Sequence, residues 1–225
     1  DNDLWGTDTT FGFQSAIGLA TEVIDCIHTT AASHNRVFMV EVMGHKAGWL
    51  TLNAGIAGGA DIILIPEIPY NIDAVIAKIK QRAASGNGFT ILAVAEGAIS
   101  QKEAAMGKKE YKQHMAEVLE KYPSVSYAIA DKILKKTGKE VRVTVPGHMQ
   151  RGGTPCAYDR VLSSRLGTTA ALMISREEYG SMVAIQNHVI TSVPLKEIAG
   201  KLKTIDPESD IITEARLLGI SFGDD

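Results

Sequence analysis

The chain has 225 residues, enough for one large domain or two small ones, and is 45% hydrophobic but only 6% aromatic, which is typical of an α/β protein with an aliphatic core. Its formal net charge of −3 gives no reason to expect a nucleic acid or an anionic membrane as a partner. No apolar run approaches the roughly 18 residues of a membrane span. Cys26 and Cys156 lack the spacing of a zinc site, which indicates reduced thiols in a cytoplasmic protein.

Helical and strand patterns alternate in the first part of the chain. Apolar side chains recur at steps of three and four residues in the segments predicted to be helices, which are 11–28, 47–57 and 72–84. Short apolar runs rich in β-branched residues mark the segments predicted to be buried strands, which are 36–43, 61–65 and 89–95. This alternation predicts an α/β fold, in which a parallel sheet has helices on both faces.

The composition changes after the third predicted strand. Residues 98–139 are charged and rich in Lys and Glu, and we interpret them as a helical excursion before a strand over 141–145. Three further elements are predicted beyond this strand, namely a helix over 158–173, a strand over 182–186 and a shorter helix near 195–202.

Gly152 and Gly153 mark a predicted boundary between two parts of the chain. We therefore expect an α/β domain over 1–151, a segment of an incomplete second domain over 152–205, and a charged C-terminal tail over 206–225.

The most informative motif is the run Gly-His-Met-Gln-Arg-Gly-Gly-Thr-Pro-Cys-Ala-Tyr-Asp over 147–159. His148 and Arg151 lie three residues apart among glycines where a predicted strand ends, so they form a compact site for an oxygen-rich anion. The guanidinium offers a planar fork of donors suited to phosphate, and the imidazole adds a hydrogen bond whose charge is tunable near neutral pH.

This run, Asp1-Asn2-Asp3 and Val42-Met43-Gly44 together resemble the phosphofructokinase family in order and spacing, over nearly the whole chain. The resemblance implies the later part of such an enzyme, starting at its catalytic aspartates, with His148 and Arg151 binding the 6-phosphate of the sugar. It implies a glycolytic kinase that transfers a phosphoryl group to the 1-hydroxyl of fructose 6-phosphate, giving fructose 1,6-bisphosphate. Mg²⁺ is the implied metal, and the implied donor is ATP, with pyrophosphate as the alternative.

Asp1 and Asp3 flank Asn2 at the start of the chain. From the triplet alone, the two carboxylates could bind magnesium, act as a general base, or cap a turn or the following helix, which is the commoner use. The resemblance implies that Asp1 takes the proton from the attacking sugar hydroxyl, while Asp3 supports charge and metal placement.

Arg36 and Arg142 each lie at the start of a predicted strand, where an arginine is most often simply solvated. The resemblance implies instead that both reach the sugar phosphate of a neighbouring subunit. Guanidinium forks suit a phosphoester dianion. We therefore expect a homo-oligomer, a homotetramer in this family, whose active sites are shared between subunits.

Met43, Gly44, His45 and Glu96 complete the predicted substrate site. A glycine lets backbone N–H groups approach a ligand, and Glu96 ends a strand at the edge of the sheet where ligands bind in parallel α/β folds. The resemblance implies that Glu96 accepts hydrogen bonds from sugar hydroxyls. It also implies an arginine where this chain has His45, so charge stabilisation would fall to a protonated His45 or to Lys46.

No phosphate-binding loop of the Gly-x-x-x-x-Gly-Lys type occurs in the sequence. By resemblance, the donor-binding part lies mostly before Asp1, and residues 152–205 would pack on it. Two alternatives stay open at this point: a non-catalytic module that binds or senses a sugar phosphate, and a structural subunit that assembles with a partner chain.

Overall fold

The computed structural model describes residues 1–31 and 36–224. Within them, a four-stranded parallel sheet has the order β2 (Ile62–Leu64), β3 (Thr90–Ala95), β1 (Val37–Val42) and β4 (Val141–Thr144). All residues of β1 and β3 are buried, as expected for central strands of a parallel sheet covered on both faces. The parallel α/β fold predicted from the sequence is confirmed.

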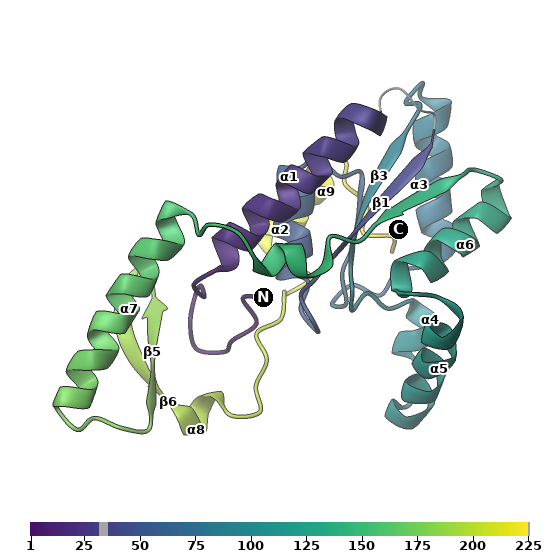
Figure 1. The fold of residues 1–225 in the computed structure, drawn as a ribbon. Coiled ribbons are helices and arrows are strands. Elements are labelled where there is room, and N and C mark those ends of the chain that lie inside the picture. Colours follow the sequence, from purple (N-terminus) through teal and green to yellow (C-terminus); the bar gives the residue numbers. More distant parts are fainter. Residues whose placement is uncertain (32–35, 225) are drawn as a thin grey trace.

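Helices cover both faces of this sheet (Figure 1). α1 (Phe13–Ala31) and α2 (Trp49–Ala57) pack on one face, and α3 (Ile72–Ala84) and α6 (Val125–Thr137) pack on the other. α1 buries an apolar stripe whose members mostly recur at steps of three or four residues, namely Phe13, Ala16, Ala20, Ile24 and Ala31. The predicted helical periodicity therefore corresponds to the buried face of the real helix.

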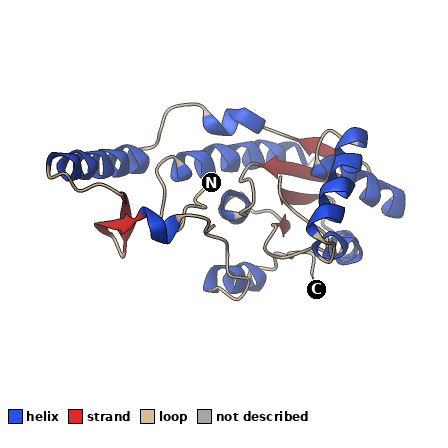
Figure 2. Ribbon diagram, turned by 90° about the horizontal axis from the view of Figure 1, so that it is seen from below, coloured by secondary structure: helices blue, strands red, loops and turns tan. Residues whose placement is uncertain are grey.

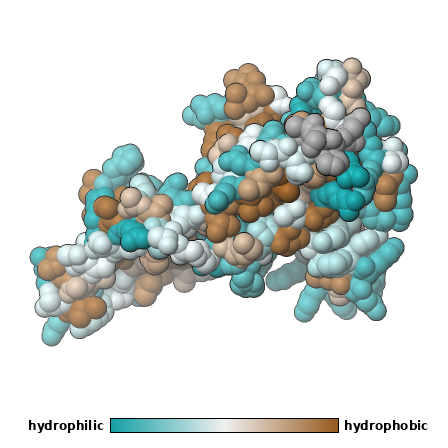
Figure 3. All heavy atoms as spheres, turned by 45° about the horizontal axis from the view of Figure 1, so that its top comes forward, coloured by the Kyte–Doolittle hydropathy of each residue, from teal (hydrophilic) through white to brown (hydrophobic). Residues whose placement is uncertain are grey.

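The charged region after β3 forms α4 (Gln101–Ala104), α5 (Lys108–Lys121) and then α6. α5 buries none of its residues, whereas α6 returns to the sheet and buries Ile129 and Ile133. On the face seen in Figure 3, hydrophobic side chains gather over the middle of the molecule, and the end that carries these helices is mainly hydrophilic. The helical excursion predicted from the Lys- and Glu-rich composition is confirmed.

A second body extends away from the sheet on the side opposite α3 and α6 (Figures 1 and 2). It contains α7 (Ala157–Ser175), the antiparallel hairpin of β5 (Ser181–Gln186) and β6 (Val189–Pro194), and α8 (Leu195–Ile198). Ala184, Val193 and Ile198 form its small core. We call this body, residues 157–198, the arm.

The arm corrects the sequence analysis at two points. β6 was not predicted, and the short helix ends at Ile198 rather than near residue 202. Asn187 and His188 form the two-residue turn, and both have positive φ angles, of 49° and 66°. Two such residues in a row match the twist of a hairpin. Since the turn contains no glycine, the usual sequence signal for it is absent.

The C-terminal segment returns to the sheet. α9 (Asp210–Leu217) was not predicted, and after it Ser221 pairs in parallel with Ile62 beside β2, with Ile63 N–H donating to Ser221 O at 2.9 Å. Phe222 is fully buried in the main core. The segment that was predicted to be a charged tail therefore contributes the apolar residues Ile212, Ala215 and Phe222 to the same core as the first helices.

Candidate active site

Loops that follow three parallel strands carry predicted site residues at the carboxyl edge of the sheet. Met43 and His45 follow β1, Glu96 follows β3, and His148 and Arg151 lie on η1 (Gly147–Arg151), a 3₁₀ turn that follows β4. The carboxyl ends of parallel strands lie at one edge. The fold thus gathers residues that are more than one hundred positions apart.

The Glu96 carboxylate joins the loops after β1 and β3. Its Oε1 accepts hydrogen bonds from Gly44 N at 3.1 Å and from His45 N at 2.7 Å. His45 has a φ angle of 54°, an uncommon conformation for a non-glycine residue. A Cβ added at Gly97 would lie 2.2 Å from His45 O, so only glycine allows these loops to lie so close.

Arg151 lies beside the N-terminal aspartate. Its Nη2 forms an ion pair with Asp1 Oδ1 at 2.5 Å, and the Arg151 side chain keeps 37% of its surface exposed. His148 lies on the same turn and is also exposed. Arg151 lines a cavity of about 260 Å³, whose wall also includes Asp1, Ser15, Gly153 and Asp159, whereas His148 is not part of this wall.

Two buried polar residues that the sequence analysis did not single out hold this part of the site. Gln150 is 3% exposed; its Oε1 accepts from Met43 N at 3.3 Å, and its Nε2 donates to Gly147 O at 3.3 Å. Asn2 is 4% exposed, and its Oδ1 accepts from Thr10 N at 3.0 Å. Gln150 thereby ties η1 to the loop after β1, and Asn2 fixes the turn between Asp1 and Asp3.

Glu67 and Asp159 are further carboxylates without an assigned role in the sequence analysis. Both oxygens of Glu67 accept from Gly48 N, at 3.0 and 3.1 Å, and Oε1 also accepts from Ile205 N at 3.1 Å. The position of Glu67, two residues after a predicted strand, is only weak evidence for a role in the site. The backbone groups that bond to Glu67 and to Asp159 lie far from them in the sequence, so no local pattern reveals these contacts.

Arg36 and Arg142 lie at the opposite edge of the sheet. Arg36 directly precedes β1, Arg142 is the second residue of β4, and both contact Glu140, at 2.7 and 2.5 Å. Because a strand rises about 3.3 Å per residue, the seven residues from Arg36 to Met43 span roughly 20 Å. One copy of the chain therefore does not bring these arginines to Asp1 and Arg151.

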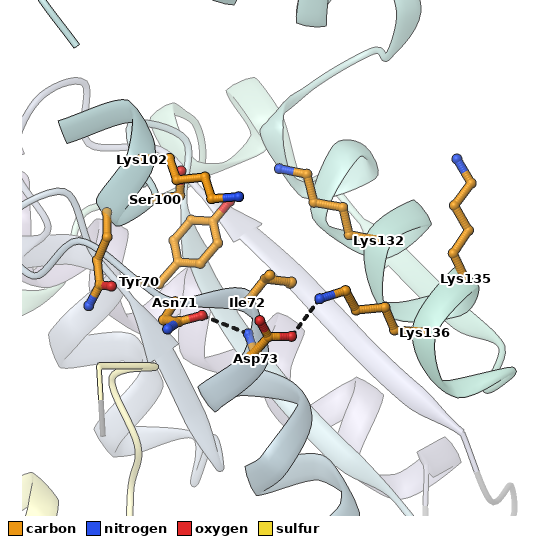
Figure 4. Close-up of a pocket in the computed structure, with 10 residues that line it drawn as sticks. Tyr70, Asn71, Ile72, Asp73, Ser100, Lys102, Lys132, Lys135 and Lys136 are labelled. Carbon is orange, nitrogen blue, oxygen red and sulfur yellow. Dashed lines mark hydrogen bonds and ion pairs between the residues drawn. The ribbon is translucent and has the colours of Figure 1, made fainter. Parts of the chain in front are cut away.

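A separate hollow of about 380 Å³ contains none of the predicted site residues (Figure 4). Lys102, Lys132, Lys135 and Lys136 line it, but Lys136 is paired with Asp73 at 2.5 Å and Lys135 with Asp131 at 2.6 Å. Asn71, also in its wall, caps α3 by accepting from Asp73 N at 2.9 Å. These contacts account for Lys135, Lys136 and Asn71 without a ligand.

Metal binding by protein groups alone is not supported by the residue set, because the described residues contain no group of three or more His, Cys, Asp or Glu that could hold an ion. Asp3 is half-buried at the edge of the site. One carboxylate suits Mg²⁺, which usually keeps several waters and takes its other ligands from substrate phosphates.

Among the described helices, none combines the length and the apolar content that a membrane crossing requires.

Known proteins resemble this chain over most or all of its length. A family model described as Phosphofructokinase matches residues 1–174. The ATP-dependent 6-phosphofructokinase of Spirochaeta thermophila is 52% identical over 224 residues, and that of Chloroflexus aurantiacus is 48% identical over 225. All of this chain is covered in both, but only 61% of each relative, so the chain spans about three fifths of their length. Both relatives are named as enzymes, which does not favour the alternative of a non-catalytic sugar-phosphate-binding module.

Solved structures show the same fold. Phosphofructokinase from Saccharomyces cerevisiae matches with a TM-score of 0.71 and 34% identity, covering 88% of this chain and 25% of that one. A pyrophosphate-dependent phosphofructokinase from Nitrosospira multiformis matches with a TM-score of 0.73 over 94% of this chain and 54% of that one, but at 20% identity, which supports the fold alone. With its parallel α/β fold and these matches, the chain belongs to the phosphofructokinase family.

Proposed function

We propose that the complete protein is an ATP-dependent 6-phosphofructokinase, which transfers a phosphoryl group from ATP to the 1-hydroxyl of fructose 6-phosphate. The observation that carries this proposal is the 2.5 Å contact between Asp1 and Arg151, because it puts a carboxylate base beside a phosphate-binding guanidinium. The two groups lie 150 residues apart in sequence, and the fold holds them at the edge where parallel α/β proteins bind ligands.

The acceptor sugar is bound by groups from three loops. Arg151 and His148 hold the 6-phosphate, since both are exposed on one turn of η1 and offer donors to an anion. Met43 and Gly44 line the sugar, and Glu96 accepts from its hydroxyls. Arg151 has five N–H donors, so it can contact the phosphate while one donor remains on Asp1.

Chemistry at the 1-hydroxyl needs a base and charge stabilisation. Asp1 takes the proton as the hydroxyl oxygen attacks the terminal phosphoryl group, a role worth roughly 10²–10⁴ in rate. His45 stands near the site through its backbone bond to Glu96, and in the imidazolium form it offsets charge on the transferred group, with Lys46 next to it. Asp3 would hold Mg²⁺ together with the donor phosphates, and the ion would supply further charge neutralisation when bound.

ATP is favoured over pyrophosphate by the names of the relatives. Those at 52% and 48% identity are named ATP-dependent, whereas the pyrophosphate-dependent neighbour is only 20% identical. The donor site itself would involve residues outside this chain, packed on the arm, which exposes Tyr158, Val161, Leu172, Ile174 and Tyr179.

We place the protein in the cytoplasm, where the free thiols of Cys26 and Cys156 stay reduced.

A second copy of the chain completes the proposed site. Arg36 and Arg142 are too far from Asp1 within one copy, yet both project from the amino edge beside β4, an edge strand with no further partner in the described sheet. Among the described residues, both guanidinium groups form an ion pair with Glu140, and each has five N–H groups, so donors remain for the phosphate of a neighbouring subunit.

Two measurements on the complete protein test the proposal, namely calorimetric titration with fructose 6-phosphate and coupled turnover with ATP. Arg151→Ala together with His148→Ala should abolish measurable binding, while Arg165→Ala, at an exposed arginine of α7, should leave it unchanged. Wild-type affinity in the double variant would refute the site. Binding by the wild-type protein without turnover would instead favour a sugar-phosphate-binding module.

A further inference from the structure

The turn that carries His148 and Arg151 is held from both sides by buried polar contacts. On its own turn, Gln150 accepts from Met43 N in the loop after β1. Eight residues after Arg151, Asp159 is 2% exposed and contacts the first turn of α1. Gln150 and Asp159 are buried, whereas His148 and Arg151 are exposed.

Asp159 and Ser15 form a compact set of hydrogen bonds. Asp159 Oδ2 accepts from Ser15 N at 2.7 Å and from Ser15 Oγ at 2.6 Å. Ser15 Oγ in turn accepts from Cys156 N at 2.9 Å. The hydroxyl therefore acts as donor and acceptor at once, and it joins the start of α1 to the start of α7.

This contact satisfies a need of α1 that its own sequence leaves open. The first turn of α1 contains no acidic residue, although the free N–H groups and the positive end of the helix dipole favour a carboxylate there. Asp159 supplies that carboxylate from 144 positions away. Burial by itself would raise the pKa of Asp159, but the hydrogen bonds from Ser15, Gly12 N and Cys156 together outweigh it and lower the pKa below its ordinary value. The carboxylate is thus charged at neutral pH.

The segment between Arg151 and Asp159 cannot set its own position. It begins with Gly152 and Gly153; Gly153 has a φ angle of 84°, and an added Cβ there would meet no heavy atom within 4 Å. Glycine has more conformational freedom than any other residue. The orientation of Arg151 therefore depends on what fixes the chain on either side of it.

We propose that Ser15 and Asp159 are positioning residues for the sugar phosphate: they anchor the chain after the glycines to α1 and so hold Arg151 where it can reach both Asp1 and the 6-phosphate. This inference rests on the proposed function. Neither residue touches the phosphate, and each acts through Arg151.

The test is the variant Ser15→Ala in the complete protein, because it removes the hydroxyl that bonds to both Asp159 and Cys156 but keeps the helix. We expect the KM for fructose 6-phosphate to rise about tenfold, as the loss of a hydrogen bond to a charged group predicts, with kcat and the KM for ATP within about twofold. Ser15→Thr, which restores a hydroxyl, should restore the KM. Ser164→Ala, at an exposed serine of α7 outside this cavity wall, should leave all three constants unchanged.

Hydrogen exchange of residues 147–155 provides a readout that does not depend on turnover, and we expect faster exchange in Ser15→Ala than in Ser164→Ala. If Ser15→Ala does not fold, Asp159→Asn, which keeps one acceptor oxygen, should show a smaller rise in KM. If the wild-type protein binds fructose 6-phosphate but the KM of the variant is unchanged, this inference is overturned and the proposed function still stands. Equal losses in kcat and both KM values also overturn it, because they indicate a general structural role. A wild-type protein that does not bind the sugar refutes the proposed function itself.

Discussion

At the scale of single residues, carboxylates of this chain bind backbone N–H groups of distant segments. Glu96 accepts from the loop after β1, Glu67 from Gly48 and Ile205, and Asp159 from the first turn of α1. Glu96 and Glu67 fix loops, and Asp159 fixes the start of a helix. A charged acceptor makes such bonds about twice as strong as neutral ones, so the shape of the site depends on these few side chains.

Replacing Glu96 with Ala should loosen the site and weaken sugar binding. Gly44 N and His45 N would lose their acceptor, which costs about 1–3 kcal/mol when the groups stay away from water. We expect a lower free energy of unfolding in urea and at least a tenfold higher KM for fructose 6-phosphate. Glu96→Gln keeps one acceptor oxygen and should lose less of both; equal losses in the two variants would contradict this account.

Asp159 should make stability depend on acid pH. Burial acts to raise its pKa, but the hydrogen bonds from Ser15, Gly12 N and Cys156 together outweigh burial, so the pKa is lowered in the folded state. A depressed folded pKa stabilises the protein above the unfolded value of about 3.9, and that stabilisation is lost as pH falls through the folded value. Unfolding free energies measured from pH 6 to 3 should therefore fall more steeply in the wild type than in Asp159→Asn. Parallel curves would be the contrary result.

At the scale of elements, the helices meet the sheet with very different tolerances. α2 lies so close to β2 and β3 that a Cβ added at Gly55 would lie 2.7 Å from Ile63 Cδ1 and 3.1 Å from Ala93 Cβ. α1 presents Gly18 to open space, where an added Cβ would meet nothing within 4 Å. One glycine is thus needed for packing, and the other only reduces helix stability.

The two glycines give a matched pair of substitutions. Gly18→Ala should stabilise the protein by about 0.5–1 kcal/mol, because it removes backbone freedom from the unfolded chain at no steric cost. Gly55→Ala should destabilise it by about 1–3 kcal/mol through overpacking. Thermal unfolding followed by circular dichroism measures both. The same sign for the two changes would show that the close contact between α2 and the sheet relaxes freely.

At the scale of the whole molecule, the predicted substrate residues lie at two opposite edges of the sheet. Arg36 and Arg142 are at the amino edge, whereas Asp1, Glu96 and Arg151 are at the carboxyl edge. Parallel strands keep their two ends apart by the full strand length, so no rotamer change brings these groups together. A site that uses all of them requires two copies of the chain.

Mixed oligomers test this division directly. Arg142→Ala and Arg151→Ala should each abolish most activity of the complete protein. After co-refolding, hybrid pairs contain one site in which both arginines are native, so an equal mixture should regain about one quarter of wild-type activity if two subunits share each site. Mixing without subunit exchange is the control. Failure of exchanged hybrids to regain activity would mean that both arginines act within one copy or that one of them has no role.

Much of the fold could be predicted from the sequence because its signals are local. The apolar period of α3 and the apolar run of β3 follow from side chains that neighbour one another along the chain. The site motif over 147–159 is equally local, so His148 and Arg151 could be named in advance. β6 and α9 could not, since the first depends on a glycine-free turn and the second on burial of Ile212 and Ala215 against distant residues.

The amino-acid sequence by itself determined the parallel α/β class and the family, because periodicity and short motifs survive without knowledge of the partners of each side chain. Only the tertiary structure decided that Asp1 lies against Arg151, that Gln150 and Asp159 hold the intervening turn, and that Arg36 lies at the far edge. These relations join residues up to 150 positions apart. The order of the strands creates them, and it leaves no local pattern in the chain.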